Sequence, residues 1–194
     1  MKNNRIKNIQ REMLSDNWYR LEKVTFEYLQ QNGEWQTQTR ESYDRGNGAV
    51  ILLYDKSRNT VILVKQFRMP TYLNGNKDGF MIEACAGLLD KDNPEDCIRK
   101  EVEEETGYKI QEIQKIFESY MSPGSVTETL HFFTAEYTSE MKVSRGGGAK
   151  DEQENIEVLE IPFDDAYEMI AAGEIRDAKT IMLLQYLKLN KLIK

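Results

Sequence analysis

Two continuous apolar runs lie close together in the first half of the chain, and they restrict the possible folds more than any other feature of the sequence. Residues 49–55 read AVILLYD and residues 60–67 read TVILVKQF, with only KSRN between them. A strand that is apolar at successive positions, rather than at alternate ones, is suited to a sheet that is covered on both faces. The sequence therefore predicts two central strands of a sheet.

The rest of the chain supplies the other elements of such a sheet. A further strand is expected over residues 79–89, followed by a helix with Pro94 in its first turn, Asp92 or Asn93 as its cap and Gly107 at its end. Further strands are expected over residues 110–120, 130–137 and 156–161, and helices over residues 163–173 and 178–189. This order of elements predicts an α/β protein in which a mixed sheet has helices on both faces.

The N-terminal segment has a different pattern. Apolar and polar residues alternate from Trp18 to Tyr43 around Asn32 and Gly33, which is a strong signal for a hairpin of two strands. We expect residues 1–45 to form a small antiparallel sheet and residues 46–194 to form the main domain. Because the hairpin is long for its own small core, we also expect a homodimer in which the hairpin packs on, or swaps to, the partner.

Composition excludes several classes of function. A net charge of −7 over 194 residues, with no basic stripe, argues against nucleic acid as a partner. The sequence has one histidine and two cysteines outside any CxxC spacing, so neither a zinc site nor a disulfide framework is expected. No segment approaches the roughly 18 apolar residues of a membrane span. We expect a cytoplasmic protein that does not bind membranes.

The stretch KEVEEETGY gathers four glutamates within little more than one helical turn. At the helical spacing of about 100° per residue, Glu101, Glu104 and Glu105 share one arc next to the apolar stripe, and Glu103 points to the opposite side. Glu101 and Glu105 face each other at i, i+4, which costs stability unless a cation lies between them. Carboxylates that face one point suit a hard cation such as Mg²⁺ or Mn²⁺.

Two ion pairs at i, i+4 are expected on the same helix, between Arg99 and Glu103 and between Lys100 and Glu104. The alternative is an acidic helix face that is simply exposed to solvent. The position of the acids beside the apolar stripe favours the wall of a half-buried cleft.

The segment GLLDKDNPEDCIRKEVEEETGY, preceded by EACA, resembles the signature of the Nudix hydrolases. The residues that match this signature are Gly87, Glu101, Val102, Glu104, Glu105 and Gly107. Three features depart from it: Lys100 replaces an arginine, Asn93 stands near the position of an upstream glutamate, and the spacing from Gly87 to Glu101 is one residue short. A lysine lacks the rigid fork of arginine and braces a carboxylate less tightly.

The likeness extends beyond this signature. The segments YDRGNGAVILLYD, VKQFRMPTYLNGN, SYMSPGSVTETLHFF, DEQENIEVLEIPF and GEIRDAKTIMLLQYL are together similar to the GDP-mannose pyrophosphatase branch of the Nudix hydrolases, which is related to the ADP-ribose pyrophosphatases. The resemblance implies an α/β/α sandwich with a mixed central sheet and a small N-terminal antiparallel β-sheet. It also implies Mg²⁺-dependent hydrolysis of a nucleotide sugar, with GDP-mannose giving GMP and mannose 1-phosphate.

The resemblance further implies roles for particular residues. Glu101, Glu105, Glu154 and the backbone carbonyl of Ala86 would bind the metal, and Glu104 would support them or bind a further ion. The general base would be Glu152 or Glu154, in a loop that follows three glycines able to act as the hinge of a lid. The positions that correspond to substrate contacts are Trp18, Arg40, Glu41, Arg68, Glu128 and Lys179. Trp18 could stack on a purine, although an aromatic residue at the start of a strand more often serves packing.

Other functions remain open at this point. The same fold could act on ADP-ribose or another nucleotide sugar. A catalytically silent Nudix domain that senses a ligand belongs to a different class, and the cluster of Glu101, Glu104 and Glu105 argues against it. A purely structural acidic protein would explain neither the glycine-rich loop nor the signature.

Overall fold

The computed structural model describes residues 4–89, 93–149 and 154–193 of the chain. Residues Met1–Asn47 and Tyr120–Thr129 form one compact unit, and Gly48–Ser119 and Leu130–Lys194 form a second. We call them the N-terminal unit and the main unit, and each is described by itself.

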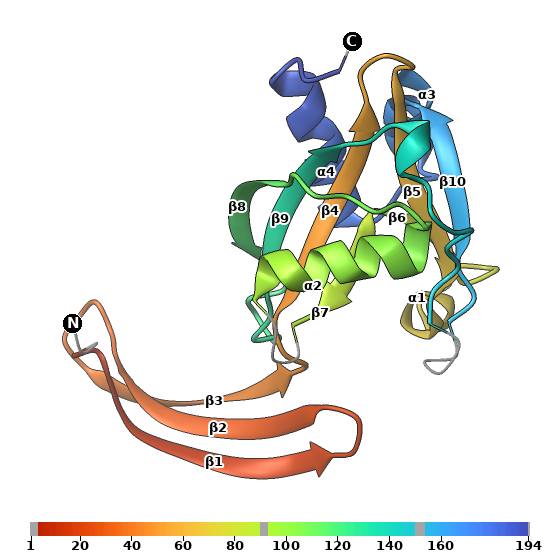
Figure 1. Ribbon diagram of the computed structural model, residues 1–194. Coiled ribbons are helices and arrows are strands. Elements are labelled where there is room, and N and C mark those ends of the chain that lie inside the picture. The colour runs from red at the N-terminus through yellow and green to blue at the C-terminus, as the bar shows by residue number, and fades with distance from the viewer. Residues whose placement is uncertain (1–3, 90–92, 150–153, 194) are drawn as a thin grey trace. The chain divides into compact units, whose positions relative to one another are not determined.

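The part of the N-terminal unit that the structure describes is built on an antiparallel sheet of three strands, in the order β1-β2-β3 (Figure 1). The strands are β1 (Ile6–Asp16), β2 (Arg20–Leu29) and β3 (Trp35–Asp44). The expected hairpin is confirmed in β2 and β3, with Gly33 at a φ of 87° in the turn between them. The expectation of only two strands was wrong, because β1 is exposed along almost its whole length and so has no apolar alternation that would reveal it.

The described residues of the main unit contain a mixed sheet of seven strands. The strands are β4 (Gly48–Asp55), β5 (Thr60–Phe67), β6 (Phe80–Glu83), β7 (Cys85–Leu88), β8 (Gln114–Tyr120), β9 (Thr129–Glu136) and β10 (Glu157–Pro162). Five of them follow the order β10-β5-β4-β9-β8, in which β4 and β9 are parallel while β5 is antiparallel to both β4 and β10. Strands β4 and β5 are central, as the apolar runs predicted, and every residue of β4 is buried.

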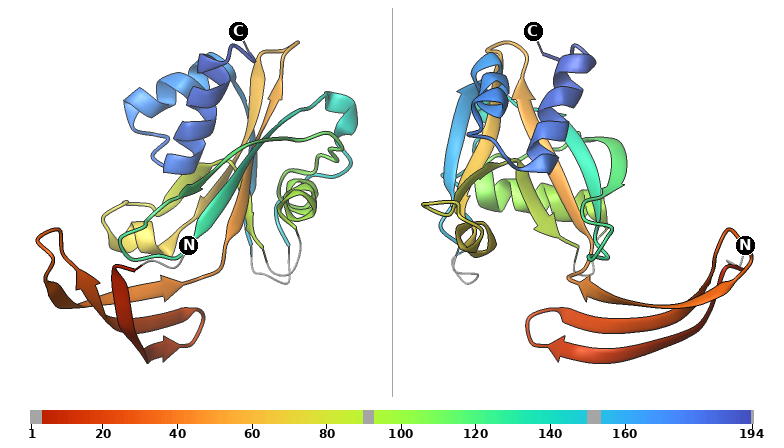
Figure 2. Two further views of the ribbon diagram at one scale, coloured as in Figure 1. Left: turned by 90° about the vertical axis from the view of Figure 1, so that its left-hand side faces the viewer. Right: turned by 180° about the vertical axis from the view of Figure 1, so that it is seen from behind.

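Helices cover both faces of this sheet, so the expected α/β/α sandwich is confirmed. The helical segments are α1 (Met69–Leu73), α2 (Pro94–Glu101), the π-helical turn η1 (Val102–Thr106), the 3₁₀ turn η2 (Ser139–Met141), α3 (Phe163–Ala172) and α4 (Ala178–Leu189). Figure 2 shows α2 on one side of the sheet and α3 and α4 on the other. The short α1 was not expected from the sequence. Within the described residues, no helix is long and apolar enough to span a membrane.

Residues 79–89 form two strands, where one was expected. Strand β6 pairs with β5 and β7 pairs with β4, and the change of partner occurs at Ala84. The backbone N–H of Ala84 donates a hydrogen bond of 2.7 Å to Oγ1 of the buried Thr180 in α4. The hydroxyl of Thr180 therefore satisfies a backbone N–H that has no partner in a neighbouring strand at this break.

Apolar packing fixes the rotation of the helical segment that carries the acidic residues. Ile98 and Val102 are fully buried, in one core cluster with Ile51 and Phe133 of the sheet. Cys85 lies in the same cluster, and both Cys85 and Cys97 are buried and outside any disulfide. The packing therefore decides which glutamates point inward and which point to solvent.

Candidate active site

The acidic helical segment begins and ends at the expected residues. Asn93 is the cap of α2, and its side-chain Oδ1 accepts hydrogen bonds from the N–H groups of Glu95 and Asp96, at 3.1 and 3.0 Å. Asp92, the alternative cap, lies outside the described residues. The segment continues through η1 and ends at Gly107, which has a φ of 78°. The segment thus has a capped start and a glycine in the left-handed conformation at its end.

Three of the four glutamates lie on the inward side of the helical segment and one lies on the solvent side, as the helical spacing predicted. Glu105 is only 2% exposed, Glu101 and Glu104 are half-buried, and Glu103 is exposed. The π-helical turn that contains three of them did not follow from the sequence. Turns of this kind occur often at functional sites.

One of the two expected ion pairs is confirmed. Nζ of Lys100 lies 3.6 Å from Oε1 of Glu104. The prediction of an ion pair between Arg99 and Glu103 was wrong, since Oε2 of Glu103 lies 3.8 Å from Nζ of Lys109.

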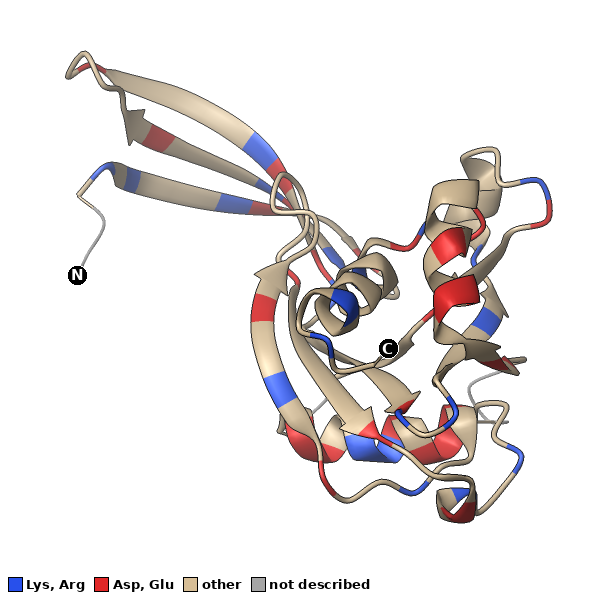
Figure 3. Cartoon of the chain, turned by 90° about the horizontal axis from the view of Figure 1, so that it is seen from above, with Lys and Arg blue, Asp and Glu red and all other residues tan. Residues whose placement is uncertain are grey.

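Arg99 instead binds residues of the first turn of α2, Glu95 at 3.4 Å and Asp96 at 3.3 Å. In Figure 3 the helical segment has acidic residues toward both of its ends and basic residues between them.

Glu105 lies at the centre of the candidate site. Its Oε2 accepts a hydrogen bond of 3.3 Å from the N–H of Ala86 in β7, and its carboxyl also contacts the Cys85 thiol. Burial, together with the nearby charges of Glu101 and Glu154, raises the pKa of Glu105 to about 8. A raised pKa means that the surroundings disfavour a further negative charge, so a cation bound here would stabilise the ionised carboxylate.

Glu101 packs directly against Gly87, the first residue of the Nudix-like signature. A Cβ atom added at Gly87 would lie 2.2 Å from the carboxyl carbon of Glu101. Gly87 pairs with Ala49 of β4 and is one residue beyond Ala86. The glycine thus leaves room for a carboxylate beside β7.

The glycine-rich loop 146–148 is docked on the end of this helical segment. The N–H groups of Gly147 and Gly148 donate to the backbone carbonyls of Glu105 and Glu104, at 2.9 and 3.1 Å. The loop's three glycines have φ angles of 67°, 112° and 84°, which disfavour other residues. The glycines therefore supply hydrogen bonds to carbonyls that the helix end leaves without partners.

Glu154 lies against the C-terminal end of the glycine-rich loop. Its Oε2 accepts a hydrogen bond of 3.0 Å from the N–H of Ala149 and lies against Gly148. The other candidate base, Glu152, lies outside the described residues. The structure thus brings Ala86, Glu101, Glu105 and Glu154 into one region and leaves Glu152 undescribed.

These residues suit a hard divalent cation by their chemistry. The donors are carboxylate and carbonyl oxygens, the ligands that Mg²⁺ and Mn²⁺ prefer. Within the described part of the chain, no three acidic, histidine or cysteine side chains are already close enough together to hold an ion. Glu105 and Glu101 nonetheless both lie against β7, at Ala86 and at Gly87, and the charges of Glu101 and Glu154 contribute to the raised pKa of Glu105.

Two of the expected substrate contacts, Arg68 and Lys179, share one carboxylate. Nε and Nη2 of Arg68 each lie 2.8 Å from Oε2 of Glu83, and Nζ of Lys179 donates to Oε1 of Glu83 at 3.0 Å. Nζ of Lys179 also donates to Asp177, at 2.8 Å. Sequence reasoning missed Glu83, because a single glutamate in an apolar strand gives no signal until its neighbours in the sheet are known.

The other expected contacts belong to the N-terminal unit. Trp18 lies between β1 and β2, is 86% exposed, and has its ring edge-on to that of Tyr19, with centroids 6.4 Å apart. Arg40 and Glu41 lie on β3 and are both exposed. Glu128 is buried, with Nε of Arg45 at 3.5 Å from its Oε1. The roles of these residues in binding stay predictions.

Comparison with known proteins identifies the family. Residues 44–184 match the model of the NUDIX domain, and residues 5–43 match a model described as the GDP-mannose pyrophosphatase NudK N-terminal domain. The chain therefore belongs to the Nudix family, as its signature suggested.

The chain is also similar to curated relatives along nearly its whole length. It is 57% identical over 190 residues to a GDP-mannose pyrophosphatase of Yersinia enterocolitica, a match that covers 98% of each chain. It is 56% identical over 185 residues to a GDP-mannose pyrophosphatase of Salmonella typhimurium, covering 95% of this chain and 96% of the relative.

Proposed function

We propose that this chain is a hydrolase that cleaves the pyrophosphate bond of a nucleotide sugar, converting GDP-mannose to GMP and mannose 1-phosphate. The near full-length similarity to GDP-mannose pyrophosphatases carries the choice of substrate. The buried Glu105, with Glu101 and Glu154 near it, supports hydrolysis over ligand sensing, because a binding module has no need for a costly carboxylate cluster.

Nudix hydrolases require a divalent metal, and we propose Mg²⁺, with Mn²⁺ as a possible substitute. Glu101, Glu105, Glu154 and the carbonyl oxygen of Ala86 would hold it, with Glu104 in support. A metal bound there would neutralise charge on the phosphate oxygens and position the water.

The chain itself would provide the base and the contacts to substrate. We propose Glu154 or Glu152 as the group that takes the proton from the attacking water. Glu154 already lies beside the carboxylate cluster and is held by the N–H of Ala149. Arg68 and Lys179 would hydrogen-bond the phosphates, and guanidinium geometry suits such contacts.

The N-terminal unit would contribute the remaining contacts. We propose that Trp18 stacks on the guanine and that Arg40, Glu41 and Glu128 bind other parts of the substrate. The 86% exposure of Trp18 leaves its ring available for stacking.

The first prediction concerns the nucleobase of the substrate, guanine or adenine. GDP-mannose should exceed ADP-ribose in kcat/KM by at least about tenfold and up to about a hundredfold, since the wrong base leaves buried polar groups unpaired. Product analysis on a panel of nucleotide sugars, with and without Mg²⁺, measures this. Equal rates, or a preference for ADP-ribose, would assign the chain to the neighbouring branch. Absence of metal-dependent turnover of every nucleotide sugar would favour the sensor function.

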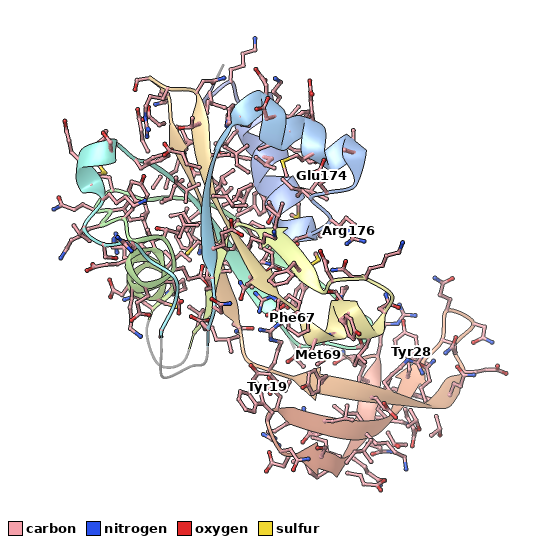
Figure 4. The ribbon with its side chains drawn as sticks, turned by 90° about the vertical axis from the view of Figure 1, so that its right-hand side faces the viewer. Tyr19, Tyr28, Phe67, Met69, Glu174 and Arg176 are labelled. Atoms are coloured by element: carbon pink, nitrogen blue, oxygen red, sulfur yellow. The ribbon has the colours of Figure 1, made fainter. Side chains whose placement is uncertain are left out.

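We also propose that the protein is a cytoplasmic homodimer. Within each chain, the N-terminal region would end at residue 45 and the hydrolase domain would begin at residue 46. Both cysteines are buried and neither is in a disulfide, which is consistent with a reducing compartment. For the dimer, the support is apolar surface left exposed in the N-terminal unit, at Ile9, Met13 and Leu14 of β1. The main unit also exposes apolar side chains, among them Phe67 and Met69 (Figure 4). Exposed apolar surface of this kind marks interaction sites.

The second prediction tests the dimer. Met13→Lys should shift the protein from dimer to monomer in analytical ultracentrifugation and lower its activity, because it puts a charge on the apolar surface of β1. Val143→Lys places the same charge on an apolar residue of the main unit that is somewhat more exposed, 56% against 46% for Met13, and it should leave the dimer intact. A wild-type protein that is monomeric at assay concentration and fully active would contradict the proposal.

A further inference from the structure

Glu83 stands out as a buried carboxylate that binds two cations at once. It is 5% exposed, at the end of β6 and next to the break at Ala84. One of its oxygens faces two nitrogens of Arg68 and the other faces the ammonium of Lys179. Although burial alone would raise it, the charges of Lys179 and Arg68 hold the pKa of Glu83 below its ordinary value. Glu83 is therefore an ionised group in the interior.

Hydrogen bonds anchor this ionic cluster to α4 and to the end of β6. Asp177 binds Lys179 through Oδ1, and its Oδ2 caps α4 by accepting from the N–H and the hydroxyl of Thr180, at 3.0 and 2.6 Å. Thr180 in turn accepts from the N–H of Ala84, the residue after Glu83. The first turn of α4 and the end of β6 are thus tied to each other by side chains that also hold Lys179.

The formal charges of the cluster cancel, because Glu83 and Asp177 balance Arg68 and Lys179. The cluster therefore offers the phosphates directed N–H donors rather than net positive charge. The side chain of Lys179 is 14% exposed and that of Arg68 is 40% exposed, so Arg68 is the member with more donor surface open to a ligand. The value of such donors depends on their being held in one place before the ligand arrives.

We propose that Glu83 is a positioning residue of the substrate site, which holds Arg68 and Lys179 together so that their N–H groups meet the phosphates of a nucleoside diphosphate sugar. The inference rests on the proposed function for the identity of the ligand. It adds a role to a residue outside the Nudix-like signature, one that acts through Arg68 and Lys179 rather than on the reacting atoms.

The test uses Glu83→Gln in the full-length protein. This variant keeps the shape of the side chain but removes the charge, and its amide NH₂ group must face one of the two cations. We expect KM for GDP-mannose in Mg²⁺ to rise by at least about tenfold while kcat changes by less than about threefold, because ground-state contacts are lost. Calorimetric titration of GDP-mannose in EDTA, where no turnover occurs, should show a similar rise in Kd.

Two further variants separate positioning from general stability. Glu83→Asp keeps the charge and should recover part of the lost affinity. Asp55→Asn removes another buried carboxylate that binds an arginine, Arg58, with its Oδ2 2.6 Å from Nε, and it should lower Tm without changing KM.

Each outcome decides a separate question. A Glu83→Gln variant that binds as tightly as the wild type would overturn the inference and leave the proposed function standing. An equal rise in KM for Asp55→Asn would also overturn it, because the effect would then follow from lost stability. A wild-type protein that neither binds nor hydrolyses any nucleotide sugar would overturn both.

Discussion

Replacing Glu105 by glutamine is expected to lower kcat/KM by about a thousandfold while the protein stays folded, since it removes a metal-binding charge without changing shape. Glu105 is buried beside the N–H of Ala86, and glutamine can still accept that hydrogen bond through its amide oxygen. Because the surroundings raise the pKa of Glu105 to about 8, the loss of its charge should not lower Tm in the absence of metal. Steady-state kinetics with Mg²⁺ and thermal unfolding in EDTA measure the two effects.

Glu101→Gln should show a loss of activity of similar size, since Glu101 shares the inward arc of the helix. Glu103→Gln is the matched control, because Glu103 lies on the same turn but is exposed and pairs with Lys109. It should have little effect. A loss for Glu103→Gln as large as that for Glu105→Gln would show that the two faces of the helix have been assigned the wrong way round.

The central part of the fold could be predicted because its residues carry their own signal. Apolar residues at successive positions require cover on both faces, so residues 49–55 and 60–67 could be placed at the centre of the sheet. Strand β1 has no such signal, since it is held by its pairing with β2 and both its faces are exposed. The break at Ala84 was equally hidden, because it depends on which strands lie next to residues 80–88 and on a hydrogen bond from distant Thr180.

In the candidate site, too, some features follow from the local sequence and others depend on the fold. The inward position of Glu105 follows from helical spacing, which is a local property of the sequence. The partner of Arg99 did not follow, because Glu95 and Asp96 lie within its reach and compete with Glu103 for it. Glu83 could not be found from the sequence, since its partners Arg68 and Lys179 are brought to it by the fold and by no local spacing.

Gly87→Ala tests whether the position of Glu101 matters as much as its charge. A Cβ atom at residue 87 would lie 2.2 Å from the carboxyl carbon of Glu101, so the carboxylate must move away from β7. The displaced group is the end of a flexible side chain, so Tm should change little. Activity should fall by about a hundredfold, because a misplacement of about 1 Å at a catalytic site can cost that much.

Two comparisons make this prediction sharp. Gly124→Ala adds a methyl group at a glycine with no atom within 4 Å of the new Cβ, and it should behave like the wild type. The double variant Gly87→Ala, Glu101→Gln should be no less active than Glu101→Gln alone, because the two changes remove the same contribution and such effects are not additive. If the losses in kcat/KM multiplied in the double variant, Gly87 would act through something other than Glu101, and the explanation of this glycine as room for a carboxylate would be wrong.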